Sequence, residues 1–126
     1  VMMPLRIAGR STLEAGARAD ALLERVGLAA RASHRPSAMS GGEQQRCAVA
    51  RALATEPALL IADEPSGNLD RQNAERLHDL FGHLASEFGL AVVVATHNRA
   101  LADRASRVLV LSEGRLTATS TAEGVV

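Results

Sequence analysis

The chain has 126 residues, with 14 basic and 14 acidic side chains, so its formal net charge at pH 7 is zero. Because nucleic-acid-binding domains usually carry a basic excess, we expect no nucleic-acid partner. The single cysteine, Cys47, excludes an internal disulfide framework. No apolar run reaches the roughly 18 residues of a membrane span, and no signal peptide is visible. We therefore expect a cytoplasmic polypeptide that meets a membrane only through a partner.

The first part of the chain is predicted to be mainly helical. A short apolar segment interrupted by Pro4 comes first, and apolar residues then recur at helical intervals between Thr12 and Val26. Gly27 is placed to end this helix. The apolar face expected for it consists of Leu13, Ala17, Ala21, Leu22 and Val26. A second short helix is expected at residues 28–33, followed by a turn at residues 34–37.

The next segment combines a helix start with features of an anion site. Ser40 and Glu43 have the spacing of a capping box, which predicts a helix over about residues 41–54. Val49 and Leu53 would face the core in this helix, while its arginines stay in solvent. Gly41 and Gly42 have no side chains, so an anion could approach the first backbone N–H groups closely. Taken alone, the spacing of Ser40 and Glu43 favours an ordinary capped surface helix.

Two apolar strands follow, and each ends in polar residues. Residues 58–62 form a strand that we expect to be fully buried, and Asp63 and Glu64 come at its end. Residues 90–95 form the second strand, which ends at Thr96 and His97. Strands joined by a long helix should be parallel, so both polar ends should reach the same edge of the sheet. Glu64 and His97 can therefore belong to one site.

The helix between these strands gives the clearest periodic pattern in the sequence. Asp70 can cap its start and Gly89 can end it. Its expected apolar stripe consists of Leu77, Leu80, Phe81, Leu84 and Phe88. After the second strand, Asn98 can cap a short helix that reaches residue 105. Residues 108–111 and 115–118 then predict a terminal hairpin, and the tail that follows carries no interpretable signal.

Four motifs in this order resemble those of ATP-binding cassette (ABC) ATPases. Residues 39–53 (MSGGEQQRCAVARAL) resemble the signature motif, and residues 59–65 (LLIADEP) resemble the Walker B strand. Residues 67–70 (GNLD) resemble the D-loop, and residues 95–97 (ATH) resemble the switch histidine. Met39 and Ser66 stand where leucine and threonine are usual, which are mild departures. Chance agreement of four ordered motifs is negligible.

The resemblance implies an α/β fold, namely a partial P-loop NTPase domain. It would contain parallel strands with flanking helices, part of the helical subdomain and a C-terminal β-hairpin. Residues 1–54 would belong mostly to the helical subdomain and include the signature helix, and residues 55–126 would carry Walker B, the D-loop, the switch histidine and the hairpin.

The sequence contains no lysine, because all 14 of its basic residues are arginines. The P-loop motif GxxxxGK[ST] needs a lysine, so it does not occur in these residues. The family carries its P-loop upstream of the signature. We therefore interpret the chain as the C-terminal portion of one nucleotide-binding domain, with the Walker A half absent. We expect such a fragment to be inactive alone and to leave apolar faces of its sheet uncovered.

The resemblance also implies ATP and Mg²⁺ as cofactors and assigns roles to individual residues. Asp63 would hold Mg²⁺, because hard cations prefer carboxylate oxygens. Glu64 would polarise the attacking water, and His97 would contact the γ-phosphate. The residues that would cap ATP bound on the opposite subunit of a homodimer are Ser40, Gly41, Gly42, Glu43 and Gln44. Leu69 and Asp70 would run along the same subunit seam.

The GNLD sequence and the following Asn73 resemble a subfamily of ATPases for lipoprotein release, macrolide export and cell division. Within it, the opening VMMPLRIAG and Asn73-Ala74 most resemble the members that energise lipoprotein release. This implies integral-membrane permease partners, a lipoprotein substrate, and a cytoplasmic position on the inner membrane. A macrolide-export or cell-division complex is the alternative. A non-transport ABC ATPase and an inactive truncated half-domain also remain open.

Overall fold

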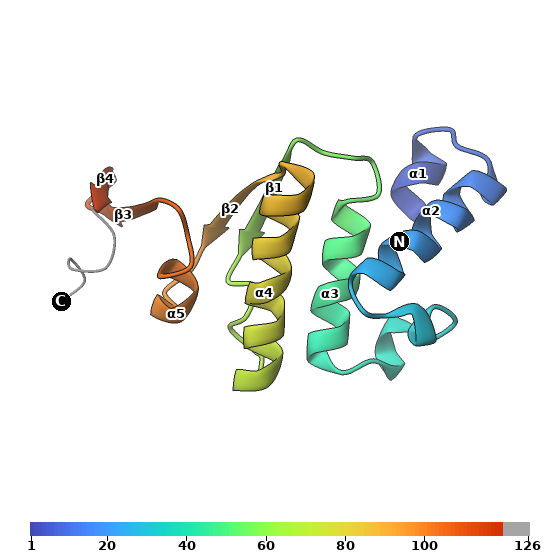
Figure 1. Cartoon of the computed structure of the whole chain (residues 1–126), viewed down its shortest axis with the longest axis horizontal. Helices are drawn as coiled ribbons and strands as arrows, with labels where there is room; N and C mark the ends of the chain where they lie inside the picture. The colour runs from blue at the N-terminus through green and yellow to red at the C-terminus, as the bar shows by residue number, and fades with distance from the viewer. Residues whose placement is uncertain (120–126) are drawn as a thin grey trace.

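The structure is a computed structural model that describes residues 1–119. The helices of the N-terminal part lie side by side, and two strands, a short helix and a separate hairpin follow toward the opposite end of the molecule (Figure 1). The elements in chain order are α1 (Met3–Ile7), α2 (Thr12–Arg25), η1 (Ala29–Arg31), η2 (Pro36–Ala38), α3 (Gly41–Ala52), β1 (Leu59–Asp63), α4 (Arg71–Phe88), β2 (Ala91–Ala95), α5 (Arg99–Ala102), β3 (Val108–Ser112) and β4 (Arg115–Thr119). The predicted α/β architecture is confirmed, and the tail after Thr119 lies outside the described residues.

Helix α2 begins with a capping box that the sequence analysis did not identify. The Ser11 hydroxyl accepts a hydrogen bond from the Glu14 backbone N–H at 3.2 Å, and the Glu14 carboxylate accepts one from the Ser11 N–H at 3.0 Å. The apolar face predicted for this helix is partly wrong, because Leu13 is 84% exposed and Ala17 and Ala21 are also exposed. The face that is buried consists of Ala15, Ala19, Leu22, Leu23 and Val26.

In the segment between α2 and α3, a glycine follows the end of α2 and a proline begins η2. Gly27 adopts a left-handed conformation with φ of 71° directly after the C-cap of α2, where a side chain would be strained. The predicted second helix is only the short 3-10 turn η1. Helix α3 buries Val49 and Leu53 as expected. Arg46, expected to lie in solvent, is half-buried instead, and its Nε donates to the Val26 carbonyl at 3.1 Å.

A single hydrophobic core joins the helices to one face of the sheet. Leu22 and Leu28 from the α2 region and Leu77 from α4 are its fully buried large side chains. Val49 from α3 and Leu60 from β1 belong to the same cluster. The core therefore fixes α3 and α4 against each other, and both helices begin at the same end of the molecule as the carboxyl ends of the strands (Figure 1).

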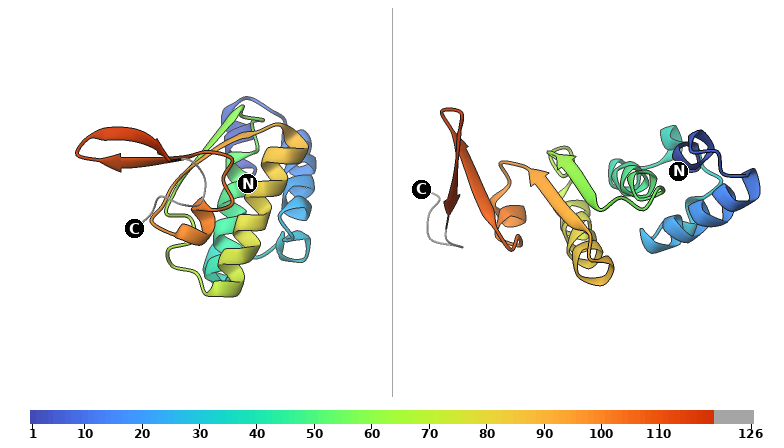
Figure 2. Two further views of the ribbon diagram at one scale, coloured as in Figure 1. Left: turned by 60° about the vertical axis from the view of Figure 1, so that its left-hand side comes forward. Right: turned by 90° about the horizontal axis from the view of Figure 1, so that it is seen from above.

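Strands β1 and β2 pair in parallel, with Leu59 opposite Ala91 and Asp63 opposite Ala95. The parallel pairing confirms the prediction, but the expectation of a fully buried strand is wrong. Leu60 is 6% exposed, whereas Ile61 is 70% exposed and faces the other way. The helices lie on only one side of this pair of strands (Figure 2). Within residues 1–119, the opposite apolar face is therefore uncovered, as predicted for a small parallel sheet.

Helix α4 begins and ends where the sequence predicts. Asp70 caps its first turn, and Gly89, with φ of 60°, follows its last residue. Leu77, Phe81 and Leu84 are buried. Phe88 departs from the predicted stripe, because it is 48% exposed and lies beneath the Arg25 guanidinium, whose carbon is 4.5 Å from the ring centroid.

The terminal hairpin is confirmed. Val108 pairs with Thr119, and Ser112 pairs with Arg115 in antiparallel register. Glu113 and Gly114 form the two-residue turn with φ of 49° and 75°, the positive values that such a turn requires. Among residues 1–119, no helix is both long enough and apolar enough to cross a membrane.

Candidate functional site

Glu64 is the first residue after β1, and its carboxylate binds the loop that follows β2. One oxygen accepts hydrogen bonds from the His97 backbone N–H at 3.0 Å and from His97 Nδ1 at 2.7 Å. The other oxygen accepts one from the Thr96 hydroxyl at 3.1 Å. The Glu64 backbone adopts a left-handed conformation with φ of 41°, which is uncommon for a residue with a side chain. The parallel strands thus bring Glu64 and His97 together.

The electrostatics of this contact keep the acid ionised. The hydrogen bond from the His97 side chain is the main cause that lowers the pKa of Glu64 below its ordinary value, and the bonds from the His97 N–H and Thr96 add to it. Because an ionised carboxylate only accepts, Nδ1 of His97 carries the proton of the shared hydrogen bond. The His97 side chain is 85% exposed, so Nε2 remains open to solvent.

The loop after Glu64 is held by backbone and buried side-chain bonds. The Gly67 N–H donates to the Glu64 carbonyl, and the Leu69 N–H donates to the Ser66 carbonyl, both at 3.1 Å. The Ser66 hydroxyl lies 3.1 Å from Nε2 of His78 on α4, and both side chains are buried. Burial lowers the pKa of His78, which favours the neutral ring. Sequence reasoning missed this pair, although a histidine within the apolar stripe of α4 was a visible signal.

Asp63 is the last residue of β1, and its side chain is exposed. Within residues 1–119, its carboxylate has no hydrogen-bond or ion-pair partner, and no group of three metal-ligating side chains occurs. A free carboxylate oxygen beside a strand end suits Mg²⁺, which usually keeps several waters and takes only one or two protein carboxylates. The residues present therefore fit such an ion.

The predicted capping box opens α3. The Ser40 hydroxyl accepts a hydrogen bond from the Glu43 N–H at 3.3 Å, and the Glu43 carboxylate accepts one from the Ser40 N–H at 2.8 Å. The backbone bond from Ser40 is the main cause that lowers the pKa of Glu43. Arg31 forms an ion pair with the other Glu43 oxygen at 3.1 Å. Glu43 thus ties the helix start to η1, in addition to its capping role.

Gln44 is likewise occupied within its own chain. Its Nε2 donates to the carbonyls of Pro36 and Met39, both at 3.0 Å. Of the predicted signature residues, the side chains of Glu43 and Gln44 therefore hold the preceding loop. Gly41 is exposed at the positive end of the helix, where an anion could approach its backbone.

Residues 67–70, which were predicted to form a D-loop, are followed by the first turn of α4 and lie against the start of α3 in the same chain. Asp70 accepts hydrogen bonds from the Asn73 N–H at 2.8 Å and from Asn73 Nδ2 at 2.7 Å. These bonds lower the pKa of Asp70, with the backbone bond as the larger cause. A Cδ2 atom of Leu69 is 3.6 Å from the position that a Cβ on Gly41 would take. The sequence alone did not predict this packing between the two motifs.

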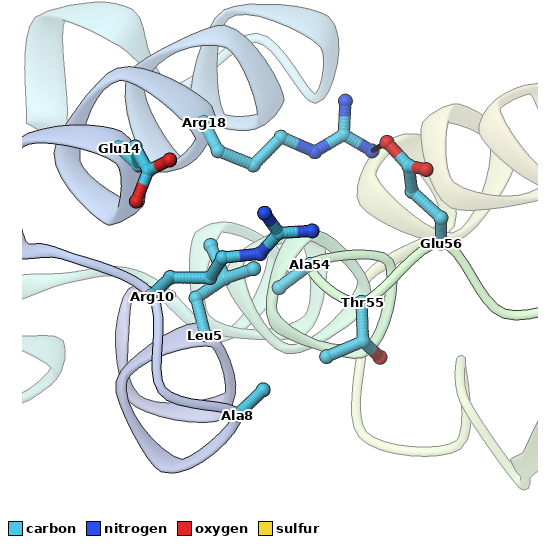
Figure 3. A pocket seen from close by; sticks show the side chains of 8 residues that line it. All are labelled: Leu5, Ala8, Arg10, Glu14, Arg18, Ala54, Thr55 and Glu56. Atoms are coloured by element: carbon cyan, nitrogen blue, oxygen red, sulfur yellow. Dashed lines mark ion pairs between the residues drawn. The ribbon is translucent and has the colours of Figure 1, made fainter.

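A hollow of about 320 Å³ lies elsewhere, between α1, α2 and the segment after α3 (Figure 3). Arg18 from α2 crosses it to form an ion pair with Glu56 at 3.2 Å, and Arg10 points into the same space. Glu56 precedes β1, whereas Glu64 follows it, so the hollow lies toward the other end of that strand. It is not part of the site formed by Glu64 and His97.

Comparisons with known proteins give one consistent result. A family profile described as "ABC transporter" matches residues 3–67. The lipoprotein-releasing system ATP-binding protein LolD of Pseudoalteromonas translucida is 52% identical over 117 residues, which cover 93% of this chain and 50% of that protein. LolD 2 of Caulobacter vibrioides is 53% identical over 116 residues, covering 92% and 51% respectively. The chain spans about half the length of these curated relatives.

Solved structures resemble the chain in the same way. One is a dimeric post-hydrolysis state of an ATP-binding cassette bound to ADP and Pi, with a TM-score of 0.72 and 38% identity over 86% of this chain and 49% of that one. Another is a component of an ABC transporter complex from Clostridium perfringens, with a TM-score of 0.78 and 29% identity over 86% of this chain and 43% of that one.

Proposed function

The chain belongs to the ABC transporter family, and from this premise we propose that it carries the Walker B, signature and switch-histidine part of an ATPase that drives lipoprotein release from the bacterial inner membrane. The contact between Glu64 and His97 is the observation that carries the ATPase proposal. The identity of 52% to a protein named for lipoprotein release supports the substrate class.

In this proposal, Glu64 polarises the water that attacks the γ-phosphate. Its hydrogen bonds keep the carboxylate ionised and orient it, and an ionised carboxylate can accept a proton from water. His97 is held through Nδ1 and its backbone N–H, which leaves Nε2 to face the phosphate. The Thr96 hydroxyl donates a hydrogen bond to the other oxygen of the Glu64 carboxylate and so restrains it further. Catalysis of this kind depends on positioning and charge stabilisation more than on covalent chemistry.

Asp63 would hold Mg²⁺, which when bound neutralises charge on the nucleotide phosphates. The start of α3 would serve a nucleotide bound mainly by a second subunit. Ser40, Gly41 and Gly42 would present hydroxyl and amide groups at the positive helix end, an arrangement that favours phosphate. The similar cassette solved as a dimer with ADP and Pi supports a homodimer in which such contacts cross the seam. Leu69 and Asp70 would line that seam.

Membrane partners follow from the same proposal. An ATPase of this kind would bind integral-membrane permease subunits, lie on the cytoplasmic face of the inner membrane, and leave the lipoprotein itself to the permease. The 126 residues contain no lysine, so a Walker A lysine must come from outside them. Isothermal calorimetry on the isolated chain should therefore detect only weak ATP binding.

The hydrolysis proposal is tested in a complete nucleotide-binding domain, in which a Walker A segment accompanies this sequence. Glu64→Gln keeps the side-chain volume and removes the base, so ATP should still bind while turnover falls by about 10²–10⁴-fold. Glu113→Gln is the matched control, because Glu113 is also a glutamate with positive φ but lies in the hairpin turn. Near-normal turnover of Glu64→Gln would assign the base role to another group.

The substrate proposal is tested separately in vesicles that hold the permease and a lipoprotein. The wild-type ATPase should release the lipoprotein in an ATP-dependent manner, and Glu64→Gln should not. ATP hydrolysis that a macrolide stimulates, without any lipoprotein release, would instead support the macrolide-export alternative. This outcome would leave the ATPase proposal intact.

A further inference from the structure

The side chain of Asn73, in the first turn of α4, fills the space next to Gly42 in the signature helix. A Cβ atom on Gly42 would lie 2.5 Å from Asn73 Oδ1, 2.7 Å from Cγ and 2.9 Å from Cβ. Oδ1 could rotate away, but the Cβ of Asn73 is fixed by the backbone of α4. Gly42 is therefore required by its own chain, before any nucleotide is considered.

The same side chain is bonded to the D-loop. Nδ2 of Asn73 donates to one Asp70 oxygen at 2.7 Å, and the Asn73 N–H donates to the other at 2.8 Å. Leu69, the residue before Asp70, reaches within 3.6 Å of the Cβ position of Gly41. Asn73 thus contacts the signature helix on one side and Asp70 on the other.

Both helices are anchored in the core, which makes this contact stiff. The buried side chains of Val49 and Leu53 anchor the α3 region in the core. The buried side chain of Leu77, one turn beyond Asn73, does the same for α4. A shift of the α3 start toward α4 would drive Gly42 into Asn73, and a shift of Asn73 would carry Asp70 with it. Because the Asn73 side chain occupies the place where a Cβ on Gly42 would lie, the two segments have little space to move closer to each other.

We propose that Asn73 is a positioning residue that holds the signature start and the D-loop of one chain in fixed register. This inference rests on the proposed function, in which both segments face the nucleotide at the subunit seam. Movement of either segment on nucleotide binding or hydrolysis is then transmitted to the other through Asn73 and Gly42. An ordinary packing contact at this position would affect stability alone.

The contact is tested first by thermal unfolding of the complete nucleotide-binding domain. Gly42→Ala should lower Tm in the wild-type background, because the new Cβ has no space. In an Asn73→Gly background the clash is removed, and Gly42→Ala should raise Tm by about 2–4 °C, as alanine does elsewhere in a helix. Gly82→Ala is the control, since no atom lies within 4 Å of its Cβ position in α4, and it should raise Tm in both backgrounds. If the Tm changes of Gly42→Ala and Asn73→Gly simply add in the double variant, the proposed contact between the two side chains' positions is contradicted.

The positioning role is tested by Asn73→Ala and Asn73→Asp. The aspartate keeps the shape of asparagine but removes the Nδ2–H donor and places a second carboxylate beside Asp70. We expect both variants to bind ATP with unchanged affinity as monomers, while kcat and ATP-driven dimerisation fall about tenfold or more. Gln72→Ala, an exposed neighbour on the same turn, should leave all three quantities unchanged.

Two contrary outcomes are distinguishable. If Asn73→Ala and Asn73→Asp lower Tm but keep kcat within about twofold of the wild type at a temperature well below Tm, the residue is only structural and the positioning role is overturned. If the wild-type domain itself neither hydrolyses ATP nor dimerises, the proposed function fails. The Gly42 and Asn73 unfolding data would then still decide whether the contact exists.

Discussion

The helices α2 to α4 and the hairpin β3–β4 use similar apolar residues in different ways. Leu22 and Leu77 are each 1% exposed in the helical core, whereas Leu111 and Leu116 in the hairpin are 69% and 63% exposed. None of residues 108–119 is fully buried. Helices α2, α3 and α4 pack against one another and so cover one another's apolar side chains. The hairpin lies apart from these helices (Figure 2). Apolar composition alone therefore does not show where a stable core lies.

The largest effect should come from truncating a core leucine in α4. Leu77→Ala removes a buried side chain, so the free energy of unfolding of the complete domain should fall by about 2–5 kcal/mol. Leu111→Ala, the matched change in the hairpin, should alter it by no more than about 0.5 kcal/mol. Urea denaturation measures both values. An equally large loss for Leu111→Ala would show that the hairpin surface is covered in solution.

A smaller effect is expected from the caps that begin the helices. Ser11→Ala and Ser40→Ala each remove a hydroxyl that accepts a backbone N–H, so each should cost about 1 kcal/mol of unfolding free energy. Ser112→Ala in the hairpin is the control, because no cap depends on it in the described residues, and it should cost less. Urea denaturation again gives the comparison. If Ser112→Ala lowered the free energy of unfolding as much as Ser11→Ala and Ser40→Ala do, the expected difference between the helices and the hairpin would be contradicted.

The smallest effect per group should come from acidification, and it should also concentrate in the helices. Hydrogen bonds lower the pKa of Glu14, Glu43 and Asp70, all at helix starts. A lowered pKa means that these carboxylates stabilise the fold when the pH is above their ordinary value of about 4, and that this contribution is lost as the pH falls through the lowered values. Unfolding midpoints in urea should fall gently from about pH 7 to 5, because burial lowers the pKa of His78 below its ordinary value, and should fall further below about pH 5 as these carboxylates are protonated.

Replacing Glu43 by glutamine should reduce the acid dependence, because the group no longer titrates. A midpoint that rises as the pH falls below about 4 would contradict the sign of these pKa shifts.

Local chemistry explains what the sequence predicted well. The capping spacing of Ser40 and Glu43, the Asp70 cap and the terminal hairpin each depend on residues close together in the sequence, so each could be placed without knowledge of tertiary structure. The parallel pairing also followed, since an amphipathic helix between two apolar runs allows few alternatives. The meeting of Glu64 and His97 is a consequence of that topology.

Tertiary packing explains what was missed. In α2, alanines occur on several faces, so periodicity did not reveal that Ala15 is buried and Ala17 is not. The exposure of Ile61 depends on which elements cover the sheet, not on the strand's own residues. The fit of Asn73 against Gly42 depends on the distance between two helices, which no local pattern contains.

The parallel pairing of β1 and β2 also bears on the order in which the chain folds. The hairpin joins neighbouring residues through a two-residue turn and can close in about 1–10 μs. Pairing Asp63 with Ala95 requires the long segment that contains α4 to bring β2 back beside β1. Closing this segment costs conformational entropy before any contact between the strands forms. The bond between Glu64 and His97 should therefore be among the last to form. In a complete nucleotide-binding domain, an intermediate with an intact helical core would be compact but would lack this bond, so on the proposed function recovery of ATP turnover should lag behind recovery of the helical core.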